Sequence, residues 1–95
     1  MSEDAFELVE KESVSALVFP VAEVLAKADD IKLRTADINR AISLGNLEHQ
    51  KVKIYFEDDK GRKYVNTTIW AVTEDAVVLK QNTVIPIRRI IKLEI

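Results

Sequence analysis

Residues 51–95 decide the fold and read KVKIYFEDDKGRKYVNTTIWAVTEDAVVLKQNTVIPIRRIIKLEI. The stretch opens with an alternation in which Val52, Ile54 and Phe56 share one face. Apolar residues at every second position, rich in β-branched and aromatic types, predict a strand with one buried face. The following residues, 58–61, combine two aspartates with a glycine, which is typical of a tight turn.

The next run, residues 62–73, is too long for one flat strand. Val65 and Ile69 share a parity, whereas Trp70 and Val72 lie on the opposite one. A change of buried parity part-way along a strand indicates a bend. We therefore expect one bent strand that serves both halves of a barrel or sandwich.

Short strands and turns fill the rest of the stretch. Turns at residues 74–75 and 81–82 flank a strand at 76–80 and precede another at 83–85. Pro86 cannot donate to a strand ladder, so it ends its strand or lies at an edge. Residues 87–89 are predicted to form a single helical turn, and residues 90–95 a final strand with Ile91, Leu93 and Ile95 facing inward. Residues 47–95 are thus predicted to form a five-stranded antiparallel small barrel.

This pattern resembles the Sm-like and Src-homology-3-type small barrels. The resemblance is carried by the turn Asp59-Lys60-Gly61, the long strand from Tyr64 to Thr73, and the segment Val84-Ile85-Pro86-Ile87-Arg88-Arg89-Ile90. It concerns the fold, and one fold supports many functions. The whole chain also resembles short, single-domain bacterial proteins of no assigned activity, through Leu44-Gly45-Asn46 and Thr67-Thr68-Ile69-Trp70-Ala71.

The RNA site of Sm-like proteins does not transfer to this sequence. Where that family carries an Asp-x-x-Met-Asn-type loop, this chain has Val72-Thr73-Glu74-Asp75-Ala76. An acidic pair stands where a uracil pocket needs a neutral amide. The family's glycine-rich second signature is replaced by Pro86-Ile87-Arg88-Arg89.

The first half of the chain is predicted to be a helical leader. Residues 1–13 form an acidic, partly ordered segment, and residues 14–46 show apolar spacings of three and four, which favour helices at about 20–28 and 36–44. Because Pro20 is favoured at a first helical position, the first helix is expected to begin there; a kinked helix from Ser13 is the alternative. Thr35 is interpreted as an N-cap and Gly45 as a C-terminal stop, with a loop at Asp29-Asp30.

These elements together predict an α+β fold in which one or two N-terminal helices pack on the barrel. A short helix is not stable alone in water. We therefore expect Val24, Leu25, Ile38 and Ile42 to cover an open end or face of the barrel, in one domain of 95 residues.

Composition excludes several classes of function. The chain has no cysteine and a net charge of −2, which is far from the basic balance of a dedicated duplex-DNA binder. The acidic start and the absence of a long apolar run predict a cytoplasmic protein with no membrane partner.

The sequence also predicts that the protein is not an enzyme and needs no metal or cofactor. Because the chain has no cysteine and His49 is its only histidine, neither a cysteine–histidine catalytic pair nor a two-histidine metal site can form within one chain. The acidic groups at 29–30 and 57–59 lack the ligand spacing of a calcium loop. Two glycines, Gly45 and Gly61, do not make a phosphate-binding loop.

The best candidate for function is the outward face of the barrel, where aromatic side chains lie among cations. The predicted binding face comprises Lys51, Lys53, Tyr55, Arg62, Lys63, Tyr64, Trp70, Arg88, Arg89 and Lys92. The first interpretation is an interaction or regulatory module that binds a protein partner, or a second copy of itself, through its outer strands or an edge. One alternative is sequence-tolerant binding of single-stranded nucleic acid, in which bases stack on aromatic rings and lysine or arginine contacts phosphate. The other is a solvated strand face without a ligand, whose lysines discourage edge pairing and whose aromatic side chains pack under the helical leader.

Overall fold

The computed structural model describes residues 6–48, 51–80 and 83–94. Over these residues the chain forms one α-helix, seven strands and short 3₁₀ helices. In chain order they are β1 (Glu7–Leu8), η2 (Lys11–Ala16), α1 (Ala28–Glu48), β2 (Val52–Glu57), β3 (Arg62–Thr67), β4 (Ile69–Val72), β5 (Ala76–Leu79), β6 (Val84–Pro86), η4 (Ile87–Arg89) and β7 (Ile90–Glu94).

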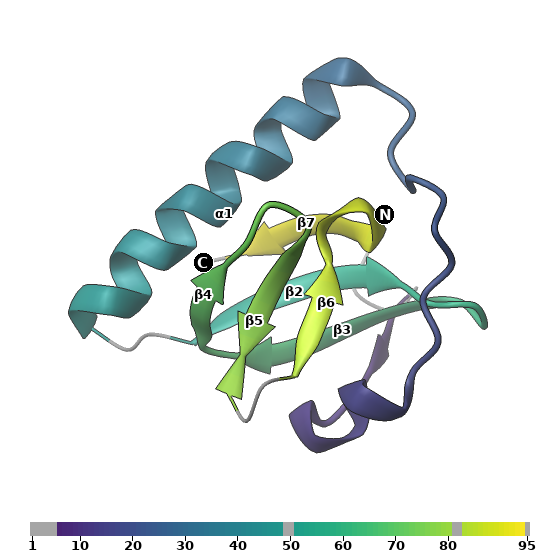
Figure 1. Cartoon of the computed structure of the whole chain (residues 1–95), viewed down its shortest axis with the longest axis horizontal. Helices are drawn as coiled ribbons and strands as arrows, with labels where there is room; N and C mark the ends of the chain where they lie inside the picture. Colours follow the sequence, from purple (N-terminus) through teal and green to yellow (C-terminus); the bar gives the residue numbers. More distant parts are fainter. Residues whose placement is uncertain (1–5, 49–50, 81–82, 95) are drawn as a thin grey trace.

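The strands form two sheets rather than one closed barrel (Figure 1). The larger sheet has the order β1-β3-β2-β7, and the smaller has the order β4-β5-β6. All pairs are antiparallel except β1 with β3, which is parallel. The α+β class is therefore confirmed, whereas the closed five-stranded barrel is wrong. The chain passes between the sheets after β3 and through η4, and the ladder is interrupted at both places.

The bent strand predicted at residues 62–73 is confirmed as two strands in different sheets. β3 ends at Thr67 and β4 begins at Ile69, and both side chains are buried. The register of β4 against β5 then shifts between Ile69 and Ala71. Such a shift changes the direction in which the side chain of the extra residue points. Trp70 occupies this position and its side chain is 57% exposed.

The core lies between the two sheets and under α1 (Figure 1). The predicted inward face of the first strand is confirmed, since Val52, Ile54 and Phe56 are all buried. On the last strand Leu93 is buried and Ile91 half-buried, while Ile95 lies outside the described residues. Helix α1 contributes the buried Ile38 and Ala41 and the half-buried Ile42, which agrees with the predicted cover.

The helices differ from the prediction. One α-helix, α1, spans Ala28–Glu48, and the helix expected at 20–28 is absent. Asp29 and Asp30 stand in the first turn of α1, where negative charge is stabilising near the positive end of the helix dipole. Thr35 is not an N-cap; its hydroxyl donates to the carbonyl of Ile31, one turn back inside the helix. The helix also continues past Gly45.

Residues 17–27 form an extended segment, here called the strap, that runs from η2 to α1 (Figure 1). Pro20 disfavours the helical conformation of the residue before it. The strap's backbone is instead hydrogen-bonded to distant parts of the chain: the Asp59 amide donates to the Val18 carbonyl, and the Val24 amide donates to the Arg88 carbonyl. These long-range bonds replace the helical bonds that the apolar spacing had predicted.

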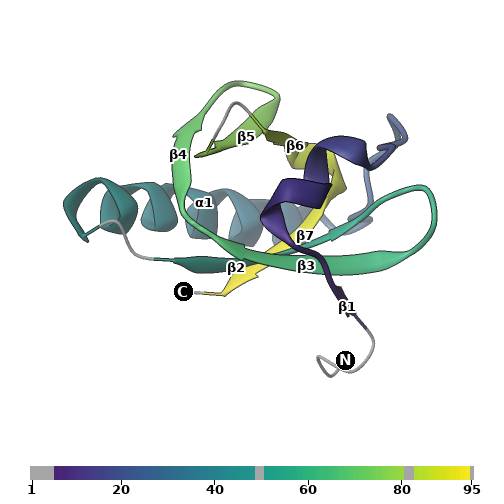
Figure 2. The same cartoon turned by 90° about the horizontal axis from the view of Figure 1, so that it is seen from below.

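The N-terminal segment packs against the larger sheet, on the side of the molecule opposite α1 (Figure 1). β1 lies along the edge of β3, where the Val9 amide donates to the Tyr64 carbonyl at 2.9 Å (Figure 2). Phe6, Val9 and Val14 are buried. Residues 6–13 are thus part of the fold, and residues 1–5 lie outside the described part of the chain.

The predicted turns agree with the structure where it describes them. Asp58 accepts hydrogen bonds from the amides of Lys60 and Gly61, and Gly61 has a φ of 151°, which favours glycine. At the next turn, the Thr73 hydroxyl accepts from the amides of Asp75 and Ala76. The turn expected at residues 81–82 lies outside the described residues. Pro86 ends β6, and residues 87–89 form the predicted single turn, η4.

Candidate functional site

Two neighbouring hollows lie along the outer side of β3 and the start of β4. The first has a volume of about 360 Å³ and is lined by Leu8, Val9, Glu10, Lys11, Lys51, Lys53, Tyr64 and Asn66. The second has a volume of about 180 Å³ and is lined by Lys11, Lys51, Thr67, Thr68, Trp70 and Lys80. Because Lys11 and Lys51 line both, the two hollows are adjacent, and they are here called together the groove.

The floor of the groove follows from strand periodicity. Tyr64, Asn66, Thr68 and Trp70 occupy every second position along the bent strand. Alternate residues of a strand point to the same face, so these four share the outward side. The residues between them, Val65, Thr67 and Ile69, point inward and are buried. The pattern that fills the core therefore also places an aromatic ring at each end of the groove.

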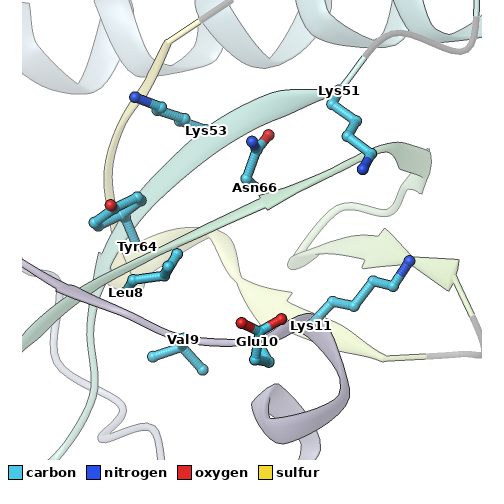
Figure 3. A pocket seen from close by; sticks show the side chains of 8 residues that line it. All are labelled: Leu8, Val9, Glu10, Lys11, Lys51, Lys53, Tyr64 and Asn66. Atoms are coloured by element: carbon cyan, nitrogen blue, oxygen red, sulfur yellow. The ribbon is translucent and has the colours of Figure 1, made fainter.

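The walls bring cations from three separate parts of the chain. Figure 3 shows Tyr64 and Lys53 at one end of the first hollow, with Lys51 and Lys11 at the other and Asn66 between them. Four lysines and one acid, Glu10, line the groove in all. Lys53 is 4.0 Å from Glu94 and its ammonium lies 5.9 Å from the centre of the Tyr64 ring. The groove is thus locally basic in a chain whose net charge is −2.

Tyr64 is held from behind by a second ring. Its ring stacks on Tyr55, with centroids 5.5 Å apart and an angle of 28° between the planes. Tyr55 in turn meets the edge of Phe6 at 5.0 Å and lies under the Lys92 ammonium at 4.8 Å. Offset or edge-on aromatic pairs are stabilising. The orientation of Tyr64 is therefore fixed before any ligand binds.

This packing changes the role predicted for Tyr55. It was expected on the outward binding face, and its strand parity does place it opposite the core. Its side chain is nevertheless only 1% exposed, because Phe6 from the N-terminal segment and Tyr64 cover it. Tyr55 supports the groove from beneath and does not offer a contact surface.

Lys63 and Arg89 were also expected on the binding face, and both are buried. The Lys63 ammonium donates to both carboxylate oxygens of Asp58 at 2.8 Å. Arg89 donates to the carbonyls of Glu57 at 3.0 Å and Ala22 at 2.7 Å. Both cations join the turn or the strap to the sheets, so their side chains are structural.

The carboxylates that pair with buried cations have lowered pKa values. Burial on its own would raise the pKa of Asp58, but hydrogen bonds from Lys63 and from the turn amides outweigh it and hold the pKa below its usual range. Glu23 on the strap accepts two hydrogen bonds of 2.7 Å from Arg34, and this pairing lowers its pKa. Both pairs therefore favour the charged form in the folded protein.

The remaining predicted residues divide between the groove and other surfaces. Lys51, Lys53, Tyr64 and Trp70 meet in the groove. Three others do not line it: Arg62 is exposed 3.6 Å from Glu57, Arg88 is exposed on η4, and Lys92 covers Tyr55.

Eight groove residues were missed by the sequence analysis: Leu8, Val9, Glu10, Lys11, Asn66, Thr67, Thr68 and Lys80. Asn66 shares the outward parity of Tyr64, which was a usable signal. Lys80 follows Leu79, which pairs with Ile69 in the same sheet, so its place near Trp70 depends on the register of β4 against β5, which shifts at Trp70. Glu10 and Lys11 gave no signal, because only the docking of the N-terminal segment onto β3 brings them to the groove.

Neither a metal site nor a membrane span is found in the part of the chain described. No group of three or more potential ligand side chains that could hold a metal ion occurs among residues 6–48, 51–80 and 83–94. His49 lies outside these ranges. Within the same ranges, no helix combines the length and the apolar character needed to cross a bilayer.

Comparison with known proteins identifies no relative. No protein-family model matches the chain, and no curated protein or solved structure shows significant similarity. The resemblance to Sm-like and Src-homology-3-type barrels therefore stays a prediction from the sequence.

Proposed function

We propose that the protein is a non-catalytic module that binds single-stranded nucleic acid in the groove, without strong dependence on base sequence. The observation that carries the proposal is that an exposed ring, Trp70, and a half-buried ring, Tyr64, line the groove together with four lysines. Proteins that bind single strands combine a basic groove for the phosphates with aromatic rings on which bases stack.

The physical state of the two rings supports this function. Trp70 is 57% exposed although it is the largest apolar side chain in the sequence, and a stacked base would cover it. Tyr64 is half-buried and is already fixed by Tyr55. A ring that is ordered beforehand loses little conformational entropy when a ligand stacks on it. The groove thus favours the alternative function over the protein partner that the sequence analysis placed first.

Binding is expected to weaken with salt and with loss of Trp70. A fluorescence polarisation titration of a labelled ten-nucleotide strand at two salt concentrations should show a log–log slope of about −3, since each neutralised phosphate contributes about −0.7 and four lysines are present. Trp70→Ala should weaken binding about 5- to 100-fold, because stacking on an aromatic ring is worth roughly 1–3 kcal/mol per base.

Leu33→Ala is the matched control, since Leu33 is 61% exposed on α1 and lies outside the groove. It should bind as the wild type does. An affinity that does not change with salt, or a Trp70→Ala variant that binds normally, would refute the proposal.

A second candidate function, binding of a protein partner, is favoured by the outer face of the smaller sheet. Ala71, Val78 and Val84 lie in one row across its three strands, and Val84 is 47% exposed. Val84→Asp should disrupt an association through this row, whether with another protein or with a second copy. Sedimentation of the wild type and the variant tests self-association: an identical mass for both, at concentrations up to the millimolar range, would contradict self-association through this row.

A further inference from the structure

We infer that the two hollows are consecutive subsites for one strand, with one base on Tyr64, another on Trp70, and the connecting phosphates held between Lys11 and Lys51. This rests on the proposed function and makes it more specific, because it defines the ligand as a strand of several linked nucleotides. A free mononucleotide could occupy only one subsite.

The two hollows share part of their lining. Tyr64 lines only the first hollow and Trp70 only the second, whereas Lys11 and Lys51 line both. The two ammonium groups therefore stand where a chain passing from one ring to the other must cross. They come from different elements, since Lys11 begins η2 and Lys51 directly precedes β2, so they approach the groove from opposite walls.

The charged side chains of the first hollow favour phosphate at its junction with the second. Glu10 places a carboxylate in this hollow between Leu8 and Lys11 (Figure 3), and it repels a phosphate on its own side. The cations at the junction are the more favourable position for phosphate. The surface around Tyr64, with its ring and the Asn66 amide, suits a base.

The fold holds the backbone of Lys11 in place. Val14 anchors η2 with its side chain 1% exposed, and the Ser13 amide donates to the Glu10 carbonyl at 2.9 Å. The backbone that carries Lys11 is thus ordered by the core. A cation on an ordered backbone loses less entropy on binding than one on a mobile tail.

The distance between the two aromatic residues limits the length of strand that the groove can hold. Tyr64 and Trp70 are six residues apart on strands that rise about 3.3 Å per residue, so their Cα atoms are at most about 20 Å apart. A nucleotide strand rises about 3.4 Å per nucleotide when it is fully stacked and more when its bases are separated. The span between the two aromatic residues therefore accommodates about three to six nucleotides.

The test uses the intrinsic fluorescence of Trp70, the only tryptophan of the chain. Thymidine monophosphate and oligothymidylates of two to twelve nucleotides are titrated into the full-length protein. We expect the apparent affinity to rise at least tenfold between one nucleotide and about three to six, and then to level off. Quenching that is equally strong with the mononucleotide would overturn the two-subsite arrangement and leave the proposed function intact. Absence of both quenching and polarisation change at every length would overturn the proposed function itself.

The junction is tested by the double variant Lys11→Gln/Lys51→Gln. It should lose most of the gain with length and reduce the salt slope by about 1.4, which is two phosphate contacts at about 0.7 each. Lys60→Gln, at an exposed position of the turn after β2, is the control. It should keep both the gain in affinity with strand length and the wild-type salt slope. A double variant with the wild-type dependence on length would overturn the assignment of Lys11 and Lys51.

Polyglutamate separates charge from base stacking, because it is an anionic chain without bases. It should compete weakly and leave the fluorescence of Trp70 unchanged. Competition as strong as that of an oligothymidylate would assign the groove to an acidic peptide and overturn the inference.

Discussion

Asp58→Ala is expected to lower the free energy of unfolding by about 3–5 kcal/mol, and Lys63→Ala by a similar amount. The Lys63 ammonium donates to both oxygens of the Asp58 carboxylate at 2.8 Å, and the Asp58 side chain is 1% exposed. Removing either partner leaves a buried charge without its counter-charge. Asp58→Ala also removes the acceptor for the turn amides of Lys60 and Gly61. Urea denaturation followed by circular dichroism measures the change.

The same pair makes stability depend on acid. Because the pKa of Asp58 is lowered in the folded protein, the unfolded chain binds more protons at low pH. The contribution of the Asp58–Lys63 pair to the free energy of unfolding is present above the ordinary Asp58 pKa of 3.8. This contribution is lost as the pH falls through the lowered pKa of the folded protein. Glu23 acts in the same direction from its ordinary value of 4.5. Asp58→Asn should therefore show a shallower loss of stability below about pH 4 than the wild type.

Lys60→Ala is the matched control for this prediction. Lys60 lies in the same turn with its side chain exposed. The free energy of unfolding of the Lys60→Ala variant should therefore differ from that of the wild type by less than about 0.5 kcal/mol. If Lys63→Ala were as stable as Lys60→Ala, the buried ion pair would not stabilise the fold.

Arg89→Ala is expected to lower the free energy of unfolding by about 3–6 kcal/mol, since two hydrogen bonds from a charged donor are lost and each contributes about 1.5–3 kcal/mol. Arg89 joins β2 to the strap through the carbonyls of Glu57 and Ala22, and its other nitrogen lies 3.5 Å from the Glu57 carboxylate. The substitution leaves both carbonyls without this donor. The strap should then open more readily, which amide hydrogen exchange of residues 17–27 would report.

Arg88→Ala provides the comparison, because Arg88 is the exposed neighbour of Arg89 on the same turn. Only the side chain is removed, so the backbone bond from Val24 to the Arg88 carbonyl stays. We expect no more than about 0.5 kcal/mol of change. Equal effects of the two substitutions would show that Arg89 does not anchor the strap. Neither arginine lines the groove, so nucleic-acid affinity should persist wherever the variants are folded.

The strands were predictable because their signals are local. The alternation of Val52, Ile54 and Phe56 and the turn at residues 58–61 depend only on near neighbours in the sequence. Pro86 marked the end of β6 for the same reason. The closed barrel was wrong because the pairing of distant strands depends on how the whole chain packs. Strand periodicity states which side is buried and does not state which strands pair.

The helix was misplaced because two physical readings of the same residues competed. Apolar spacings of three and four in residues 14–28 resembled a helical face, yet the strap is extended and its bonds reach residues 59, 88 and 89. Asp29 and Asp30 were unfavourable for a helix end and favourable for a helix start. The helix-dipole rule was correct, but the two aspartates were taken for the end of one helix when they stand at the start of α1.

The exposure of a candidate-site residue could be predicted where it depends on strand parity. It could not be predicted where it depends on whether another segment of the chain covers the strand. Tyr64 and Trp70 were correctly placed on the outward side. Lys63 shares the inward parity of Val65, so its burial could have been predicted. The burial of Tyr55 under the leader was one of the alternatives, but the sequence could not decide it, because Phe6 covers Tyr55 from a segment some fifty residues earlier.

The position of β7 beside β2 has a consequence for the order of events as the chain leaves the ribosome. α1 rests mainly on β7 and β4, and the strap is bonded to residues 59, 88 and 89, all of which are synthesised later. The first half of the protein has nothing to pack on until these residues emerge. Folding that depends on contacts so distant in sequence is slow. We therefore expect the first half of the chain to stay unfolded, and accessible to chaperones, until the second half has been synthesised and has folded.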